Sequence, residues 1–144
     1  MTNYSPTLAT NTKFQDFVVS FYKTSDTAPP SSPSVDPYLQ FFTPEAPLTM
    51  ASKRVVGHSE ITELRKGMWT SVTKRHHVVE NVASVDDETV LVNGYVDYRL
   101  INNKDITTEW AAIMKLTKSE EGEYKMKFYQ VYLDPSVAAK ALTE

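Results

Sequence analysis

Apolar residues in the first half of the chain recur at the spacing of one helical face. One set follows the i, i+3, i+4, i+7, i+8 pattern and gives that face an aromatic stripe. Its members are Phe14, Phe17, Val18, Phe21 and Tyr22. The helix they predict ends near Asp26, because the Pro/Ser-rich segment 28–34 cannot continue it. Asp36 followed by Pro37 is typical of the start of a second, short helix. Helical spacing over 59–71 predicts a third.

The pattern changes after residue 72, where four stretches rich in β-branched and aromatic residues follow one another. They span 73–85, 89–101, 105–117 and 124–133. The connections between them are of hairpin length. Parallel strands would require long crossover connections, so we predict four consecutive antiparallel strands. Two shorter strand candidates, 48–50 and 53–56, precede the third helix.

Helices before residue 72 and hairpin-linked strands after it predict an α+β fold. In this fold, three N-terminal helices pack on one face of a curved, mostly antiparallel sheet. A chain of 144 residues fits a single domain, 1–144. We expect its core to span about 12–135, with 1–11 and 136–144 peripheral.

Alternation along the strands divides their side chains between two faces of the sheet. The better core face combines small residues with polar-tipped aromatic residues, as the floor of a ligand pocket requires. The residues that we expect to bind a ligand there are Tyr98, Trp110, Gln130 and Tyr132 from the strands, with Tyr38 and Trp69 from the helical half.

The opposite face carries too much apolar surface to be left in water. Its apolar residues include Tyr95, Ile113, Tyr129 and Val131. We expect a homodimer to cover this face, unless the sheet curls enough for other elements to do so. Asp97, Arg99 and Glu109 are predicted to form a charge cluster on the same face. A shift of one residue in the strand pairing would instead bring Asp97 and Glu109 into the pocket.

Composition removes several classes of function. The formal net charge is −3 and no basic run is present, so the electrostatic signature of a nucleic-acid-binding protein is missing. The chain has no cysteine, which excludes disulfides, thiol nucleophiles and zinc–thiolate sites. Neither a secretory signal nor an apolar run of about 20 residues is present. We therefore expect a cytoplasmic protein that binds no membrane.

Two of the three histidines, His76 and His77, are neighbours directly after Arg75. Neighbouring residues of a strand point to opposite faces, so only one of the two can face a given pocket. The divergence also argues against a metal site built on the pair, and we expect no metal. A histidine in a closed pocket is suited to proton transfer, because its ordinary pKa lies near neutrality.

The order of elements resembles the NTF2-like superfamily and, within it, the SnoaL-like group. The passages that carry the resemblance are FFTPEAPLTMASKRVVGHSEI (41–61), RHHVVENV (75–82) and MKFYQVYLD (126–134). Together with GHSEITELRKGMW, GYVDYRL and EWAAIMKL, they are most similar to small single-domain SnoaL-like proteins of filamentous fungi. The resemblance covers about residues 12–135.

This resemblance implies a cone-shaped cavity between the helices and the concave face of the sheet, with dimers formed through the convex face. It also implies that the histidine used by the enzymes faces the cavity, with an asparagine four residues later on the same side. His77 and Asn81 have that spacing, so His77 becomes the catalytic candidate, Asn81 a substrate-binding candidate, and His76 points outward.

The chain departs from the scytalone dehydratase-like members, which add a second histidine on the next strand and an aspartate on the first helix. Val96 stands in the first of these places and Lys23 in the second. Two hypotheses follow. One is a cofactor-independent isomerase, cyclase or dehydratase of secondary metabolism, acting on a hydrophobic, oxygenated small molecule such as a polyketide or terpenoid. The other is a non-catalytic ligand-binding or dimeric adaptor protein on the same scaffold.

Overall fold

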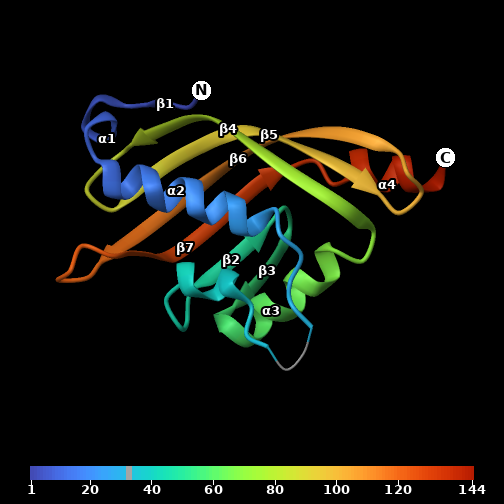
Figure 1. Ribbon diagram of the computed structural model, residues 1–144, viewed down its shortest axis with the longest axis horizontal. Coiled ribbons are helices and arrows are strands. Elements are labelled where there is room, and N and C mark those ends of the chain that lie inside the picture. The colour runs from blue at the N-terminus through green and yellow to red at the C-terminus, as the bar shows by residue number, and fades with distance from the viewer. Residues whose placement is uncertain (32–33) are drawn as a thin grey trace.

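The computed structural model describes residues 1–31 and 34–144 (Figure 1). The strands are β1 (Asn3–Tyr4), β2 (Pro47–Met50), β3 (Lys53–Val56), β4 (Val72–Ser84), β5 (Thr89–Leu100), β6 (Asp105–Lys118) and β7 (Tyr124–Leu133). The helices are α1 (Pro6–Ala9), α2 (Thr12–Ser25), the 3₁₀ helix η1 (Pro37–Phe41), α3 (Gly57–Met68) and α4 (Ser136–Thr143).

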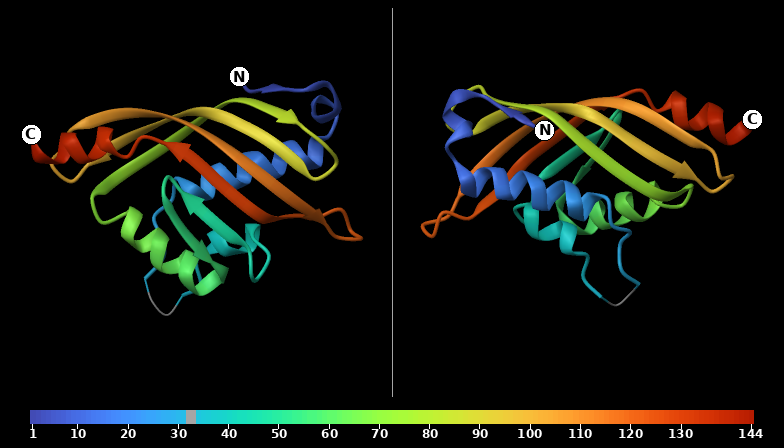
Figure 2. Two further views of the ribbon diagram at one scale, coloured as in Figure 1. Left: turned by 180° about the vertical axis from the view of Figure 1, so that it is seen from behind. Right: turned by 45° about the horizontal axis from the view of Figure 1, so that its top comes forward.

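A single curved sheet runs in the order β1-β4-β5-β6-β7-β2-β3. The four long strands pair as an antiparallel meander, as predicted. Parallel pairing of β1 with β4 and of β2 with β7 makes the whole sheet mixed. Helices α2 and α3 cover the same, concave face (Figure 2). The predicted α+β cone is therefore confirmed, and α4 packs at the end of the sheet against Val72 and Leu100 through Ala141.

The aromatic stripe of α2 fills the core beneath the sheet. The side chain of Asn11 caps the helix by accepting a hydrogen bond from the amide of Phe14, as capping residues do. Phe21 is fully buried, and its ring centre lies 5.2–5.8 Å from those of four other aromatic residues. These are Tyr38, Phe41, Phe42 and Tyr129. The packing fixes the axis of α2 across the sheet.

A buried ion pair holds the C-terminal end of α2. Arg65 of α3 donates from Nε to Asp36 at 2.9 Å, and its other nitrogens donate to the carbonyl oxygens of Ser25 at 3.2 Å and Thr27 at 2.9 Å. One guanidinium thus joins α3 to both ends of the segment between α2 and η1. Asp26, the C-cap of α2, lies between Ser25 and Thr27, whose carbonyl oxygens Arg65 binds.

Three irregularities interrupt the pairing of the long strands, the first between Val72 and Lys74, and the other two decide which predicted site residues face the cavity. Val79 and Asn81 of β4 pair with the adjacent residues Gly94 and Asn93 of β5, so that Glu80 is an extra residue in β4. Between Lys115 and Leu116, the partners in β7 change from Phe128 to Met126, which leaves Lys127 unpaired. An inserted residue of this kind is a β-bulge, and it exchanges the faces of all side chains beyond it. Alternation alone therefore assigns residues wrongly past each bulge.

The outer, convex face is less apolar than the sequence predicted. Tyr129 and Val131, expected there, are buried in the core with 4% exposure each, because they follow the bulge in β7. Leu91 and Tyr132 are exposed instead, by 46% and 50%. Together with other residues of β4–β7, they line an open groove of about 470 Å³. The homodimer stays a prediction, and its contact surface is corrected accordingly.

Within the described residues, none of the helices has the length and apolar character that crossing a membrane requires.

Candidate active site

The candidate site is a narrow cavity between the concave face of the sheet and the helices α2, η1 and α3. Its volume is about 30 Å³, room for roughly two water molecules. Four of the residues predicted to form a site line it. These are Tyr38, His77, Tyr98 and Trp110. Their roles in binding or catalysis stay predictions, but the structure brings them together from η1, β4, β5 and β6.

His77 is held by Asp26. Nδ1 of the imidazole lies 2.5 Å from Oδ1 of the carboxylate, and the backbone amide of His77 donates to both carboxylate oxygens at 3.0 Å. A carboxylate only accepts hydrogen bonds, so the proton of the neutral ring resides on Nδ1. Nε2 has no hydrogen-bond partner in the part of the chain that the structure describes. The lone pair of Nε2 is therefore left to act on a ligand.

Burial lowers the pKa of His77 below its ordinary value of 6.5. The hydrogen bond and the charge of Asp26 act in the opposite direction, and the positive charge of Arg75 adds to the lowering. The ring packs between Tyr22 and Trp110, with centroid distances of 5.3 and 5.6 Å. His77 is consequently a neutral base at physiological pH, and an Asp neighbour is in place to stabilise its protonated form.

Two buried tyrosines pack next to His77 and the cavity. The hydroxyls of Tyr22 and Tyr129 are 3.0 Å apart and buried. Burial raises the pKa of both, so both stay protonated. Tyr22 also lies 5.1 Å from Trp110 between ring centres. Of the two, only Tyr129 lines the cavity, and Tyr22 packs behind it.

Asn81, Gln130 and Tyr132 lie on the other face of the sheet, so the prediction that they share the cavity with His77 was wrong. Asn81 is exposed on the convex face, where it donates to Asn93 at 3.0 Å, because the bulge in β4 separates it from the face of His77. Gln130 and Tyr132 lie beyond the bulge in β7 and also point outward. Tyr129 and Val131 line the cavity in their place.

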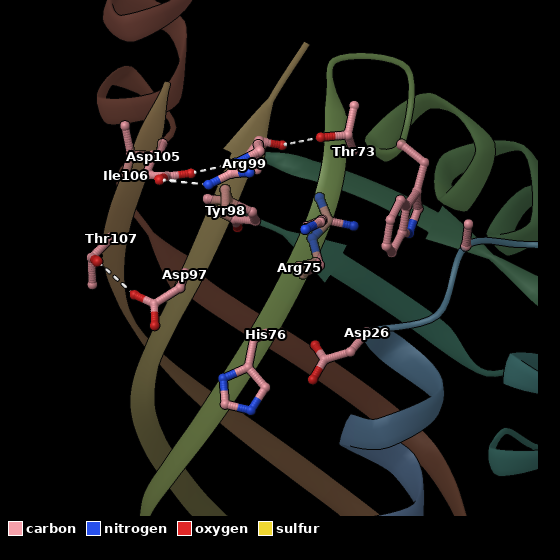
Figure 3. A pocket seen from close by; sticks show the side chains of 13 residues that line it. Asp26, Thr73, Arg75, His76, Asp97, Tyr98, Arg99, Asp105, Ile106 and Thr107 are labelled. Carbon is pink, nitrogen blue, oxygen red and sulfur yellow. Dashed lines mark hydrogen bonds and ion pairs between the residues drawn. The ribbon is translucent and has the colours of Figure 1, made fainter. Parts of the chain in front are cut away.

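Asp97 and Glu109 are exposed, so they lie outside the narrow cavity. Asp97 accepts a hydrogen bond from Thr107 at 2.6 Å, while Arg99 pairs with Asp105 at 2.8 Å rather than with the two predicted acids (Figure 3). The predicted cluster of Asp97, Arg99 and Glu109 is thus replaced by two separate pairs.

His76 is exposed and does not line the narrow cavity. It borders a wider, open pocket of about 740 Å³ at the ends of β4, β5 and β6 (Figure 3). Trp69, the remaining predicted residue, also lines this pocket. Arg75 and Tyr98 line both spaces and form the boundary between them. No group of three potential metal-ligating side chains occurs among the described residues.

Asp26 is the residue of the candidate site that the sequence analysis missed. The expected aspartate was sought within the first helix, and Lys23 was found there. The C-cap position, three residues later, supplies the carboxylate. A signal was present, because a negative charge at the C-terminal end of a helix is unfavourable next to the helix dipole. An acid in that place is better explained by a partner elsewhere in the fold.

A comparison with protein-family models finds no match, and neither does a comparison with curated proteins. Solved structures do match. A protein assigned as a scytalone dehydratase from Novosphingobium aromaticivorans aligns with a TM-score of 0.72 and 13% identity, over 89% of this chain and 86% of that one. A protein assigned as a SnoaL-like polyketide cyclase from Jannaschia sp. CCS1 aligns with a TM-score of 0.70 and 15% identity, over 92% of each chain.

A third structure, TerC crystallised with polyporic acid, aligns with a TM-score of 0.68 and 11% identity, over 92% of this chain and 99% of that one. The fold is therefore NTF2-like, with SnoaL-like and scytalone dehydratase-like proteins among its structural neighbours. At these identities the likeness defines the fold, and the reaction must be argued from the site.

Proposed function

We propose that the protein is a cofactor-independent enzyme of the isomerase, cyclase or dehydratase type, acting on a hydrophobic, oxygenated small molecule. The hydrogen bond between Asp26 and His77 carries the proposal. It leaves Nε2 of a neutral imidazole free beside a cavity lined by Trp110, Tyr98 and Tyr38. The naming of two structural neighbours as a cyclase and a dehydratase supports the same reaction class.

In the proposed reaction, Nε2 of His77 removes a proton from an acidic C–H or O–H group of the substrate. Asp26 stabilises the imidazolium that forms, as a carboxylate does for a general base. The same nitrogen then returns the proton to another atom of the molecule. Delivery to carbon gives an isomer, delivery to the alkoxide formed by internal attack gives a ring, and delivery to a leaving hydroxyl releases water.

A substrate larger than two waters requires the cavity to widen. Met50 and Met68 line it, and methionine is an unbranched side chain that changes rotamer at little cost. We infer that these two side chains move when a ligand enters. A polyketide- or terpenoid-like molecule of secondary metabolism fits the aromatic lining, and polyporic acid in TerC is an example of an oxygenated ligand on this fold.

The experiment is hydrogen–deuterium exchange catalysed by the protein. Cyclic ketones, β-diketones and hydroxyquinones are incubated with it in heavy water, and loss of their acidic C–H signals is followed by NMR. Exchange that depends on His77 and Asp26 and survives His76→Ala supports the proposal. Binding of these compounds without any catalysed exchange would overturn it.

The second candidate is a non-catalytic small-molecule binder or dimeric adaptor on the same scaffold. The narrowness of the cavity favours the adaptor, since ligand sites usually measure about 300–1,000 Å³. The same exchange experiment separates the two, because a binder perturbs the indole signals of Trp69 and Trp110 without accelerating exchange.

A further inference from the structure

Two arginines are buried on the helix side of the sheet, and their surroundings differ. Arg65 is 3% exposed and forms an ion pair with Asp36 at 2.9 Å, with further bonds to three carbonyl oxygens of the α2–η1 segment. Arg75 is 9% exposed, and its only hydrogen bond among the described residues runs from Nη2 to the carbonyl oxygen of Met68 at 3.0 Å. The ion pair and hydrogen bonds of Arg65 compensate the cost of burying its charge. Arg75 has no comparable set of partners.

The guanidinium of Arg75 lies between two aromatic rings, 4.8 Å from the centre of Trp69 and 5.0 Å from that of Tyr98. Nε and Nη1 are buried without an acceptor. Burial, the largest cause, lowers the pKa of Arg75, whereas the neighbouring Tyr98 hydroxyl raises it, and no carboxylate is among the groups that alter it. The carboxylate of Asp26 hydrogen-bonds to His77 and forms no ion pair with Arg75 in the described part of the chain. A buried charge without a counter-charge is costly, and such groups are retained where something else compensates them.

The same region holds further donors without acceptors. Nε1 of Trp69 and Nε1 of Trp110 are both buried and unpaired. Both indoles belong to the residues around the two pockets, and Arg75 lies at the boundary between those pockets. Four nitrogen donors in one region therefore lack acceptors, which selects a ligand that brings acceptor oxygens and, next to a guanidinium, negative charge.

The spacing along β4 relates this charge to the proposed base. Arg75 and His77 are in regular pairing with Tyr98 and Val96 of β5, so both side chains lie on the concave face, with Cα atoms about 6.6 Å apart. Tyr98 and Trp110 provide flat apolar surfaces beside them. A planar ring could therefore place an oxygen at Arg75 and an acidic C–H or O–H at His77.

We propose that Arg75 is the anion-recognition residue of the site, and that the ligand is a planar, hydrophobic molecule bearing an ionised oxygen acid, either a carboxylate or an ionised enol. This inference rests on the proposed small-molecule site and narrows its ligand class. It concerns binding alone, so its test requires no turnover and can fail while catalysis on neutral compounds stands.

The test compares matched anionic and neutral probes by isothermal titration and indole fluorescence. Naphthoate is paired with naphthamide, and hydroxynaphthoquinone, ionised at neutral pH, with its methyl ether. The wild-type protein is expected to bind at least one anion about tenfold or more tightly than its neutral counterpart, since charge-assisted hydrogen bonds exceed neutral ones. The pair that shows the preference identifies the acid as a carboxylate or an enol.

Arg75→Met removes the charge and keeps the approximate length of the side chain, and the preference should vanish in it. Arg54→Met is the matched control, because it makes the same substitution at an exposed arginine of β3 that lines neither pocket. It should keep the preference. The melting temperature without ligand adds an independent readout: Arg75→Met should equal or exceed the wild type, whereas a purely structural arginine would make it lower.

Equal binding of the anionic and neutral probes by the wild type would overturn the proposal, as would failure to bind either anion at millimolar concentration. A preference for the anionic probe that persists in Arg75→Met would also overturn the proposal. If Arg75→Met does not fold, the wild-type comparison of probes decides the matter, with Arg75→Gln as the replacement variant.

Discussion

Asp26 and His77 are 51 residues apart in the sequence, yet a 2.5 Å hydrogen bond joins Oδ1 of the first to Nδ1 of the second. The carboxylate also accepts the backbone amide of His77 through both of its oxygens. One side chain at the end of α2 thereby fixes the position of β4 and the tautomer of its histidine. The proposed chemistry depends on this relationship, and so do the first predictions.

Replacing His77 by Ala should lower catalysed exchange by about 10²–10⁴-fold, the usual contribution of a positioned acid or base. His76→Ala should change it little, because His76 is exposed and outside the narrow cavity. Exchange rates of the two variants, measured by NMR under identical conditions, check this. Full activity in His77→Ala would show that His77 lines the cavity without taking part in proton transfer.

Asp26→Asn should lower exchange by about 10²-fold or more, because an amide can donate to Nδ1 and stabilise the wrong tautomer. The same change should lower the pKa of His77 further, since the hydrogen bond and charge of Asp26 raise it. Imidazole NMR signals followed against pH report both effects. Asp87→Asn, at an exposed aspartate in the turn between β4 and β5, is the control and should alter neither. An unchanged His77 pKa in Asp26→Asn would contradict the geometry.

Stability should fall as the pH is lowered through and below 6.5. The pKa of His77 is lower in the folded protein than its ordinary value of 6.5, so the unfolded chain binds the proton more readily. Stability from this group is therefore present above 6.5 and is lost as the pH falls toward the folded pKa. Melting temperatures across this range should decline less steeply in His77→Gln than in the wild type. Identical slopes would show that the group is not buried in its neutral form.

Gly94→Ala should destabilise the protein by at least about 2 kcal/mol, as overpacking against backbone does. A Cβ at this position would lie 2.0 Å from the carbonyl oxygen of Val78, next to the bulge in β4. Gly67→Ala is the control, because no atom lies within 4 Å of its Cβ and α3 should gain up to about 1 kcal/mol. Urea unfolding of both variants gives the comparison, and a neutral Gly94→Ala would contradict the register of β4 and β5.

The protein should be a homodimer through the convex face. Leu91 and Tyr132 are exposed there beside Ile113, and burying about 800 Å² per partner would be typical of a stable pair. Light scattering at micromolar concentration measures the assembly, and Leu91→Arg should dissociate it. Val19→Arg, at an exposed apolar position of α2, is the matched control. If the wild-type protein is a monomer at this concentration, the prediction of a homodimer is wrong.

The sequence by itself determined the order of the elements and the class of the fold. The stripe of Phe14, Phe17 and Phe21 has only one use, the burial of a helix face, and hairpin-length links leave consecutive strands only one economical pairing. It also placed His77 opposite His76, because both lie on the same side of the bulge in β4. Those properties are local, so a pattern along the chain is enough to reveal them.

Only the tertiary structure decided which distant side chains share the cavity. One inserted residue in β4 and one in β7 reversed the faces of Asn81, Gln130 and Tyr132, and no feature of alternation marks where a strand bulges. The pairing of Asp26 with His77 likewise depends on how α2 ends above β4, a position set by Arg65 and Asp36 through contacts between separate elements. Periodicity fixes what each segment becomes, whereas the register between segments is fixed by packing that the linear pattern does not contain.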